Sequence, residues 1–315
     1  MLDDIKKIIT ILTPCFNEVD NVDELADAII DIGNKIPNIK INHLFIDNAS
    51  TDGTIEKLRT LSSKYDHIQV ILNNRNYGHI RSPMHGLFQS KGDAVVIMAS
   101  DFQDPPELIT EFVTRWKQGH EAVIGVKEGS DESIFFYKIR SYYYNLINKL
   151  SDTPLIKNFT GFGLYDRKVI ETLRSLDDPY PYFRGLISEL GFETATIKFK
   201  QPKRKRGFTK NNFYSLYDMA LLGITNHSKI PLRLVTFSGF IISLLSLLIG
   251  IIYFIYKLMF WDRFEVGIAP LVIGIFFFSA VQLFFIGIIG EYIGSIHTQI
   301  LKRPMVIEKE RINFD

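Results

Sequence analysis

The stretch Val95-Val96-Ile97-Met98-Ala99-Ser100-Asp101-Phe102-Gln103-Asp104-Pro105-Pro106-Glu107 joins a short apolar run to an acidic corner that two prolines close. The apolar half is typical of a buried strand, and Pro-Pro-Glu is typical of a helix start. In open α/β sheets, ligands bind at the carboxyl ends of the strands, where this corner falls. Asp101 and Gln103 offer the oxygen ligands that Mg²⁺ or Mn²⁺ prefers, so the stretch predicts a metal site. A solvated strand-to-helix turn is the alternative.

Apolar, β-rich runs alternate with segments of helical periodicity on both sides of this stretch. The alternation predicts an α/β fold with a mostly parallel central sheet and helices on both faces. The predicted strands are 8–13, 41–47, 68–72, 94–99 and 122–126, and the predicted helices are 21–34, 53–65, 79–91 and 105–118.

The composition changes sharply near residue 230 of the 315. The runs 234–256 and 266–290 carry no charge, and each is long enough to cross a hydrocarbon core of about 30 Å as a helix. Lysine and arginine gather before the first run and after the second, so the positive-inside rule places both termini and the large domain in the cytoplasm. We therefore predict a multi-pass protein of the plasma or inner membrane.

Four units follow one another along the chain. We predict a catalytic domain over 1–212, an interfacial amphipathic helix over 213–230, two transmembrane helices within 231–294 and a cytoplasmic tail over 295–315. The single Cys15 excludes an internal disulfide and fits a reducing compartment, with a catalytic thiol as the alternative to a buried filler. The basic run before the membrane lacks interleaved aromatic residues, which argues against nucleic-acid binding.

Polar residues also follow two other predicted strands. Thr13-Pro14-Cys15-Phe16-Asn17-Glu18 ends the first strand, and the run from Asp47 to Thr54, with Asp52 inside it, ends the second. With Asp101, these segments place three aspartates on one edge of one sheet. Each segment alone also suits an ordinary turn or N-cap cluster. Their shared position favours a functional site.

The ordered motifs resemble those of family 2 inverting glycosyltransferases with a GT-A fold. The membrane runs narrow the resemblance to the polyprenyl-phosphate glycosyltransferases, the group of bactoprenol glucosyltransferase and dolichol-phosphate-mannose synthase. The resemblance covers nearly the whole chain. It rests on Pro14 to Glu18, Asp47 to Thr54, Asn76-Tyr77-Gly78, Asp101 to Pro106, Arg184-Gly185, Arg206 to Lys210, Pro231 to Arg233 and Ile289 to Gly294.

This resemblance implies a metal-dependent enzyme that moves a hexose from a nucleotide sugar to polyprenyl phosphate for modification of cell-envelope glycans. UDP-glucose is the donor expected from family frequency, undecaprenyl phosphate is the expected acceptor lipid, and Mg²⁺ or Mn²⁺ is the expected cofactor. The membrane helices are also compatible with a homo-oligomer. The implied catalytic residues are Asp101, Gln103 and Asp104, with Asp101 and Gln103 facing the metal, and the implied nucleotide-sugar residues are Pro14, Asn17, Glu18, Asp47, Asp52, Asn76 and Gly78.

Four basic residues are candidates for binding the acceptor phosphate, because charge-assisted hydrogen bonds suit a phosphate. They are Arg140, Arg204, Arg206 and Lys210. For the basic run, attraction to anionic lipid headgroups is the alternative, and the two roles are compatible.

Two positions depart from the family pattern. Ala99 stands where the first aspartate of an Asp-x-Asp motif is usual, and Gly161 stands where relatives carry an aspartate near the acceptor. A sugar hydroxyl needs a general base, but a phosphate monoester, whose second pKa is about 6, arrives largely as the dianion. A lipid-phosphate acceptor can therefore react without a carboxylate at position 161.

Two other functions stay open. A processive polysaccharide synthase normally has more membrane spans and a Gln-x-x-Arg-Trp motif, whereas Arg115-Trp116 directly follows the acidic corner. A catalytically retired membrane partner would explain Ala99 and Gly161, but Asp47 and Asp101 are retained.

Overall fold

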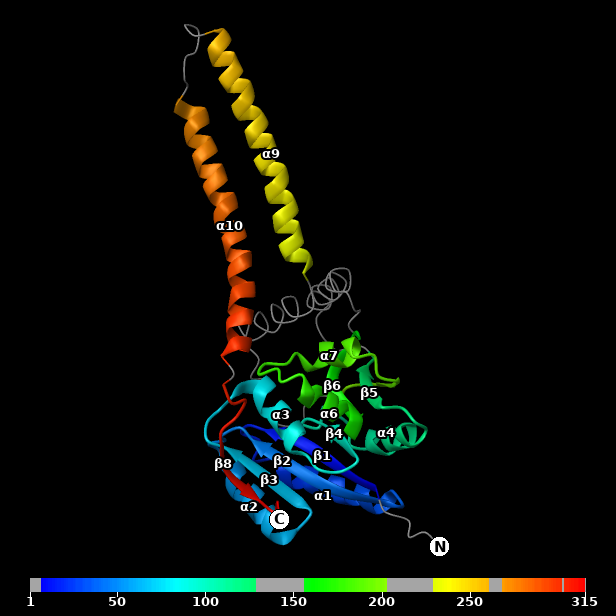
Figure 1. Cartoon of the computed structure of the whole chain (residues 1–315). Helices are drawn as coiled ribbons and strands as arrows, with labels where there is room; N and C mark the ends of the chain where they lie inside the picture. Colours follow the sequence, from blue (N-terminus) through cyan, green and yellow to red (C-terminus); the bar gives the residue numbers. More distant parts are fainter. Residues whose placement is uncertain (1–6, 129–155, 203–228, 261–267, 302, 315) are drawn as a thin grey trace.

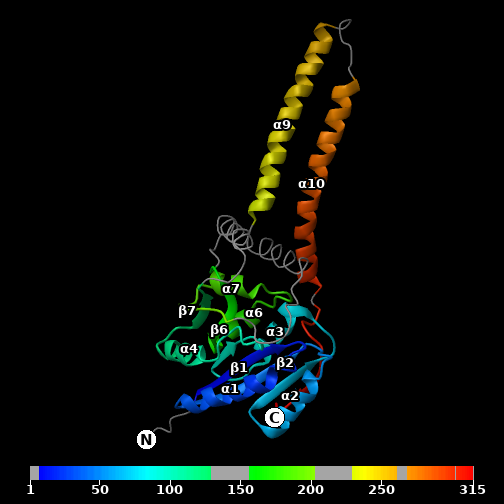
Figure 2. The same cartoon turned by 180° about the vertical axis from the view of Figure 1, so that it is seen from behind.

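The computed structural model describes residues 7–128, 156–202, 229–260, 268–301 and 303–314. Figure 1 shows an α/β domain from which two long helices project, and Figure 2 shows the same arrangement from behind. The elements are β1 (Lys7–Cys15), α1 (Val22–Lys35), β2 (Ile39–Asp47), α2 (Thr54–Lys64), β3 (Ile68–Asn73), α3 (Gly78–Gln89), β4 (Ala94–Ile97), α4 (Leu108–Lys117), β5 (Ala122–Lys127), β6 (Phe159–Asp166), α6 (Arg167–Ser175), α7 (Phe183–Glu189), β7 (Thr194–Phe199), α9 (Ile230–Met259), α10 (Ile268–Ile300) and β8 (Glu308–Ile312).

One sheet runs through the α/β domain, and the order of its eight described strands is β7-β5-β6-β4-β1-β2-β3-β8. β1 pairs in parallel with β2 and β4, β2 with β3, and β5 with β7. β6 pairs antiparallel with β4 and β5, and β8 pairs antiparallel with β3. The prediction of a mostly parallel sheet is confirmed, and the five predicted strands correspond to β1 to β5.

Helices cover both faces of the sheet, as the alternating pattern predicts. On one face, α1, α2 and α4 bury Leu25, Leu58 and Phe112 in a shared apolar core. On the other face, α3 and α6 bury Leu87 and Ile170 in a second core. Each of these helices has apolar side chains at helical spacing, and burying that stripe against the sheet is the main source of its stability.

The sequence does not predict β6, β7 or β8. β6 carries Gly161 and Gly163, and glycine is depleted in strands, which hides its pattern. β8, whose sequence is Glu-Lys-Glu-Arg-Ile, is almost entirely charged and resembles a solvated tail. It nevertheless completes the sheet beside β3, so the segment predicted as a tail, 295–315, contributes an edge strand to the α/β domain.

α9 and α10 cover the two uncharged runs of the sequence. Segments Ile230–Tyr256 and Ile273–Ile300 within them are long and apolar enough to cross a membrane, and neither is buried inside the protein. Exposed apolar surface of this extent is unusual for a soluble chain and suits a lipid environment. Residues 213–228 of the predicted interfacial helix lie outside the described residues.

His43 makes the stability of the fold dependent on pH. Its side chain is 1% exposed in the centre of β2, and its Nε2 lies 3.0 Å from Thr13 Oγ1. Burial, reinforced by the nearby His67, lowers the pKa of His43 to about 3. The folded protein therefore disfavours the protonated ring, and its stability is lost as the pH falls from the unfolded pKa of about 6.5 toward 3.

We expect the free energy of unfolding to decrease by about 3 kcal/mol between pH 8 and pH 4 because of His43. His43→Gln keeps a partner for Thr13 and removes the titrating group, so it should flatten the profile. Urea unfolding of the full-length proteins in nonionic detergent, at pH values between 4 and 8, measures how the free energy of unfolding changes with pH in the wild type and in His43→Gln. Parallel profiles for the two proteins would contradict the assignment.

Candidate active site

Three loops meet at the carboxyl ends of β1, β2 and β4. The parallel register pairs Cys15 with Asp47, which aligns the ends of β1 and β2. Each loop holds one non-glycine residue with a left-handed backbone: Asn17 at φ 57°, Ala49 at φ 63° and Phe102 at φ 58°. Such conformations cost about 1–3 kcal/mol each and cluster at functional sites. Three of the seven non-glycine residues with positive φ in the described part of the chain therefore lie at the edge of the sheet predicted to bind a ligand.

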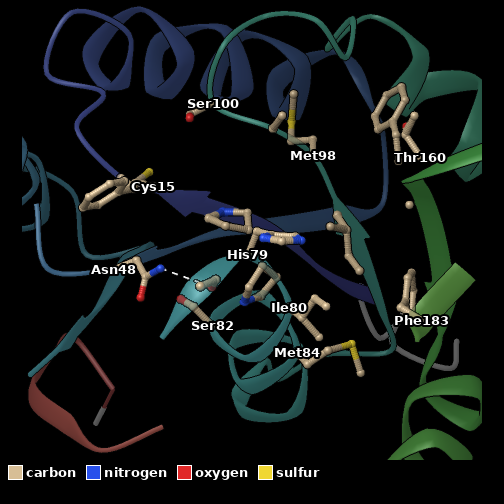
Figure 3. Close-up of a pocket in the computed structure, with 18 of the residues that line it drawn as sticks. Cys15, Asn48, His79, Ile80, Ser82, Met84, Met98, Ser100, Thr160 and Phe183 are labelled. Carbon is tan, nitrogen blue, oxygen red and sulfur yellow. Dashed lines mark hydrogen bonds between the residues drawn. The ribbon is translucent and has the colours of Figure 1, made fainter. Parts of the chain in front are cut away.

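A cleft of about 760 Å³ opens at this edge (Figure 3). Cys15 and Asn48 lie at one end of it, and Thr160 and Phe183 lie at the other. The cleft also has apolar lining, to which Phe162, Met84 and Phe183 contribute. Of the residues predicted from sequence, those that line the cleft are Pro14, Glu18, Asn76, Gly78, Asp101 and Asp104.

Asp47 stands behind the cleft wall rather than in it. Its carboxylate is fully buried and accepts hydrogen bonds from the backbone N–H of Ser50, at 2.9 Å, and from the Ser50 hydroxyl. Burial raises the pKa of Asp47, and the bonds from Ser50 oppose this rise. Ser50 Oγ in turn accepts from the N–H of Asn17 at 2.8 Å. Asp47 thus holds Ser50 in place, and Ser50 supports the loop after β1 that lines the cleft.

Asn17 and Asp52 join the same two loops. Asn17 Oδ1 accepts a hydrogen bond from the N–H of Thr51 at 2.8 Å. Asp52 accepts from the N–H groups of Val19, at 3.2 Å, and Thr54, at 3.1 Å. Burial acts to raise the pKa of Asp52, but the hydrogen bonds from Thr54 and Val19 prevail and lower it. These two predicted residues shape the framework and are not among those that line the cleft.

Asn48 is a cleft residue that the sequence did not single out. Its Nδ2 donates to Asn76 Oδ1 at 2.9 Å and to the Gly78 carbonyl at 3.2 Å. Its Oδ1 accepts from the N–H of Tyr77 at 2.8 Å and from Asn73 Nδ2 at 3.2 Å. The side chain therefore fastens the turn before α3 to the end of β2. Its position directly after Asp47 at a strand end is the signal that could have identified it.

The acidic corner brings two buried carboxylates together. Asp101 is 6% exposed and accepts the N–H of Gln103 at 3.1 Å, and Asp104 is 7% exposed and accepts the N–H of Ala99 at 2.9 Å. Burial, with the neighbouring Asp101 also contributing, raises the pKa of Asp104 to about 6. Gln103 is half-buried and is not among the residues that line the cleft.

This corner fits a divalent cation. A positive ion would offset the cost of two carboxylates held close together out of water. The described residues form no cluster of three or more His, Cys, Asp or Glu that could hold a metal ion alone. One or two carboxylates, completed by phosphate oxygens of a ligand, are the usual protein share of a Mg²⁺ site.

The four acceptor candidates, Arg140, Arg204, Arg206 and Lys210, lie outside the described residues. In the described part of the cleft, Arg184 on α7 is a lining arginine, and its guanidinium carbon lies 5.5 Å from the centre of the Tyr182 ring. In the sequence analysis, Arg184-Gly185 contributes only to the family resemblance.

Gly161, the second departure from the family pattern, lines the cleft on β6. Its φ is +103°, and a Cβ added there would lie 3.8 Å from Phe183 Cδ1, an ordinary contact. Space therefore permits a side chain, but the backbone disfavours one, at a cost of about 1–2 kcal/mol.

We expect Gly161→Asp to fold with slightly reduced stability and to leave turnover equal to or below that of the wild type. A dianionic phosphate needs no base, and an added carboxylate repels it. Steady-state kinetics with a polyprenyl phosphate acceptor, paired with thermal unfolding, gives both readouts. If the variant turned over faster than the wild type, the reaction would benefit from a base at position 161, which would contradict this prediction.

The fold agrees with the comparisons to known proteins. The model of Glycosyl transferase family 2 matches residues 10–174, and the chain belongs to this family. It is 32% identical over 309 residues to the uncharacterized glycosyltransferase YkcC of Bacillus subtilis, covering 97% of this chain and 94% of that protein.

Two further comparisons concern a relative that matches nearly the whole chain and a solved structure with a similar fold. The bactoprenol glucosyl transferase of Shigella phage SfV is 30% identical over 302 residues, covering 96% of this chain and 98% of that protein. A solved structure described as that of a mycobacterial protein has a TM-score of 0.50 at 17% sequence identity, over 70% of this chain and 73% of that one. This second likeness concerns the fold alone.

Proposed function

We propose that this protein is a membrane glycosyltransferase that moves a hexose, with UDP-glucose as the donor, to undecaprenyl phosphate. The observation that carries the proposal is the cleft, which is lined by the carboxylates of Asp101 and Asp104 together with apolar side chains such as Phe183. Such a cleft suits a donor with a charged diphosphate and an acceptor with an apolar chain. The similarity to a bactoprenol glucosyl transferase along 96% of this chain supports the same acceptor class.

The proposed mechanism assigns separate tasks to the described residues. Asp101 and Gln103 would hold Mg²⁺ or Mn²⁺, and the ion would supply positive charge to offset that of the diphosphate leaving group. Pro14, Glu18 and Asn76 line the end of the cleft proposed for the nucleotide. Asp47 and Ser50 act from behind and keep this wall rigid. Preorganised groups of this kind accelerate a reaction because they need no rearrangement as charge develops.

The acceptor phosphate is the nucleophile and attacks the anomeric carbon in line, which inverts its configuration. Its second proton is largely absent at neutral pH, so no residue near Gly161 needs to remove one. Arg140, Arg204, Arg206 and Lys210 are proposed to bind this phosphate.

The membrane arrangement is part of the proposal. α9 and α10 cross the bilayer as a hairpin, and the α/β domain, the interfacial helix 213–230 and both chain ends lie on the cytoplasmic side. A cleft close to the bilayer would receive a lipid phosphate while its prenyl chain stays in the membrane. The product would supply sugars for modification of cell-envelope glycans.

The test uses the full-length protein in detergent, labelled undecaprenyl phosphate and a panel of nucleotide sugars, with Mn²⁺ or with EDTA. We expect a lipid carrying one sugar, fastest from UDP-glucose and absent with EDTA. Polymeric product would instead indicate a processive synthase, and absence of both product and nucleotide-sugar binding would indicate a retired enzyme. Transfer to neutral polyprenol would overturn the phosphate nucleophile.

A further inference from the structure

The C-terminal strand β8 contacts the helix that forms one wall of the cleft. Figure 1 shows the chain descending from α10 to β8, which lies at the edge of the sheet beside β3. The carbonyl of Ile307 accepts a hydrogen bond from the N–H of Asn74 at 3.1 Å, just before α3 begins. Arg311 donates to Gln89 Oε1 at 2.7 Å, where α3 ends. The segment from Ile307 to Arg311 thus contacts the turn that leads into α3 and Gln89, the last residue of the helix.

Glu308 is the centre of this contact. Its carboxylate is hydrogen-bonded to His85 Nε2, in the middle of α3, and accepts two hydrogen bonds from the guanidinium of Arg311, one of them at 2.7 Å. The side chains of His85 and Glu308 are only 15% and 17% exposed. Burial acts to raise the pKa of Glu308, but the hydrogen bonds from Arg311 and His85 prevail and lower it. A shielded, charge-assisted contact of this kind is stronger than an exposed ion pair.

α3 presents its N-terminal half to the cleft. His85 directly follows a series of residues that line it, so a shift of the helix at His85 moves the wall. The α3 residues that line the cleft are Gly78, His79, Ile80, Ser82, Pro83 and Met84.

We propose that Glu308 is a positioning residue for the transfer reaction: through His85 it holds α3 in the place that the donor nucleotide requires. The inference rests on the proposed function for the identity of the ligand, but its structural part concerns α3 alone. A strand that follows the membrane helix α10 in the chain thereby supports the donor wall of the cleft.

The same strand offers a matched control. Glu310, two residues along β8, pairs with Arg59 on α2 through hydrogen bonds that include one of 2.7 Å. α2 contributes no residue to the lining of the cleft. Glu308→Gln and Glu310→Gln therefore remove the same charge from the same edge strand, but only the first should affect α3.

The first measurement is hydrogen–deuterium exchange of the full-length protein without any ligand. We expect the amides of α3 that are hydrogen-bonded within the helix, from Ser82 onward, to exchange about tenfold faster in Glu308→Gln and to be unchanged in Glu310→Gln. Equal effects of the two variants, or no effect of either, would overturn the proposal. A variant that loses protection over the whole sheet has unfolded globally, and His85→Gln then provides the same comparison from the helix side.

The second measurement is the affinity for UDP in the presence of Mn²⁺, together with donor kinetics. Glu308→Gln and His85→Gln should each weaken UDP binding and raise the donor KM about tenfold, with kcat within about twofold of the wild type. The double variant should bind UDP no more weakly than either single variant, because each substitution removes the same contact between Glu308 and His85. Additive losses would overturn the action through His85. If wild-type protein binds no nucleotide, the proposed function fails, and the exchange experiment still decides the coupling of β8 to α3.

Discussion

We expect Asp101→Asn to reduce turnover by about a thousandfold or more while leaving the fold intact. The asparagine oxygen can still accept the N–H of Gln103, which lies 3.1 Å from Asp101 Oδ1, so the loop keeps its hydrogen bond. The variant loses the negative charge that would hold the cation. Removing one preorganised electrostatic contact to a transition state lowers the rate by about a hundredfold to a thousandfold. In this variant the binding of the metal would be weakened as well.

Asp93→Asn is the matched control for this prediction. Asp93 precedes the other end of β4, where its carboxylate accepts the N–H of Ile8 at 2.7 Å, away from the cleft. Steady-state kinetics and Mn²⁺ titration in the presence of UDP should therefore give near wild-type turnover and Mn²⁺ affinity for Asp93→Asn. For Asp101→Asn, both turnover and Mn²⁺ affinity should be lost. Wild-type turnover of Asp101→Asn would remove the proposed metal site.

The proposed metal site would account for a tension in the free protein. Asp104 has its pKa raised to about 6 because it is buried beside Asp101, so the corner is unfavourable when both groups are charged. Evolution commonly retains such destabilising arrangements at sites whose ligand compensates for them. The strained backbone at Phe102, φ 58°, lies in the same loop. Both features are consistent with a corner built to bind a cation with a phosphate ligand.

The parts of the fold that the sequence predicts are those with strong local patterns. β1 to β5 are apolar and β-rich, and the helices between them carry stripes of buried residues that local periodicity reveals. β6 and β8 could not be found in this way. The neighbours of Gly161 and Gly163 in space, rather than their own propensities, make β6 a strand, and charged β8 is held by partners more than 200 residues away, such as Arg59 and His85.

The site was predicted at the level of loops more reliably than at the level of side chains. The positions of the predicted strand ends indicated which segments would meet at the edge of the sheet, and Asp101 and Glu18 from these segments line the cleft. Local sequence cannot tell which of two adjacent polar residues points outward, because this depends on the backbone after the strand ends. Asp47 faces inward to Ser50, whereas Asn48 lines the cleft.

Gly163, two residues after Gly161 in β6, leaves no room for a side chain. Gly163 sits in β6 between Ile97 of β4 and Ile124 of β5. A Cβ added at this glycine would lie 2.5 Å from the carbonyl oxygen of Val123 and 3.1 Å from Ile124 Cα. Both are backbone atoms, so the neighbouring strand cannot yield by a simple rotation of a side chain.

We therefore expect Gly163→Ala to destabilise the protein by about 3 kcal/mol or more and to lower Tm by about 8 °C, because the strand pairing must open to admit a methyl group. Gly33→Ala is the matched control: its Cβ would meet Ile41 at 3.6 Å inside α1, an ordinary contact in a helix that favours alanine. That variant should unfold at the same temperature or slightly higher. Thermal unfolding of both full-length variants in detergent measures the difference, and a Gly163→Ala protein as stable as the wild type would show that β6 and β5 are not packed this closely.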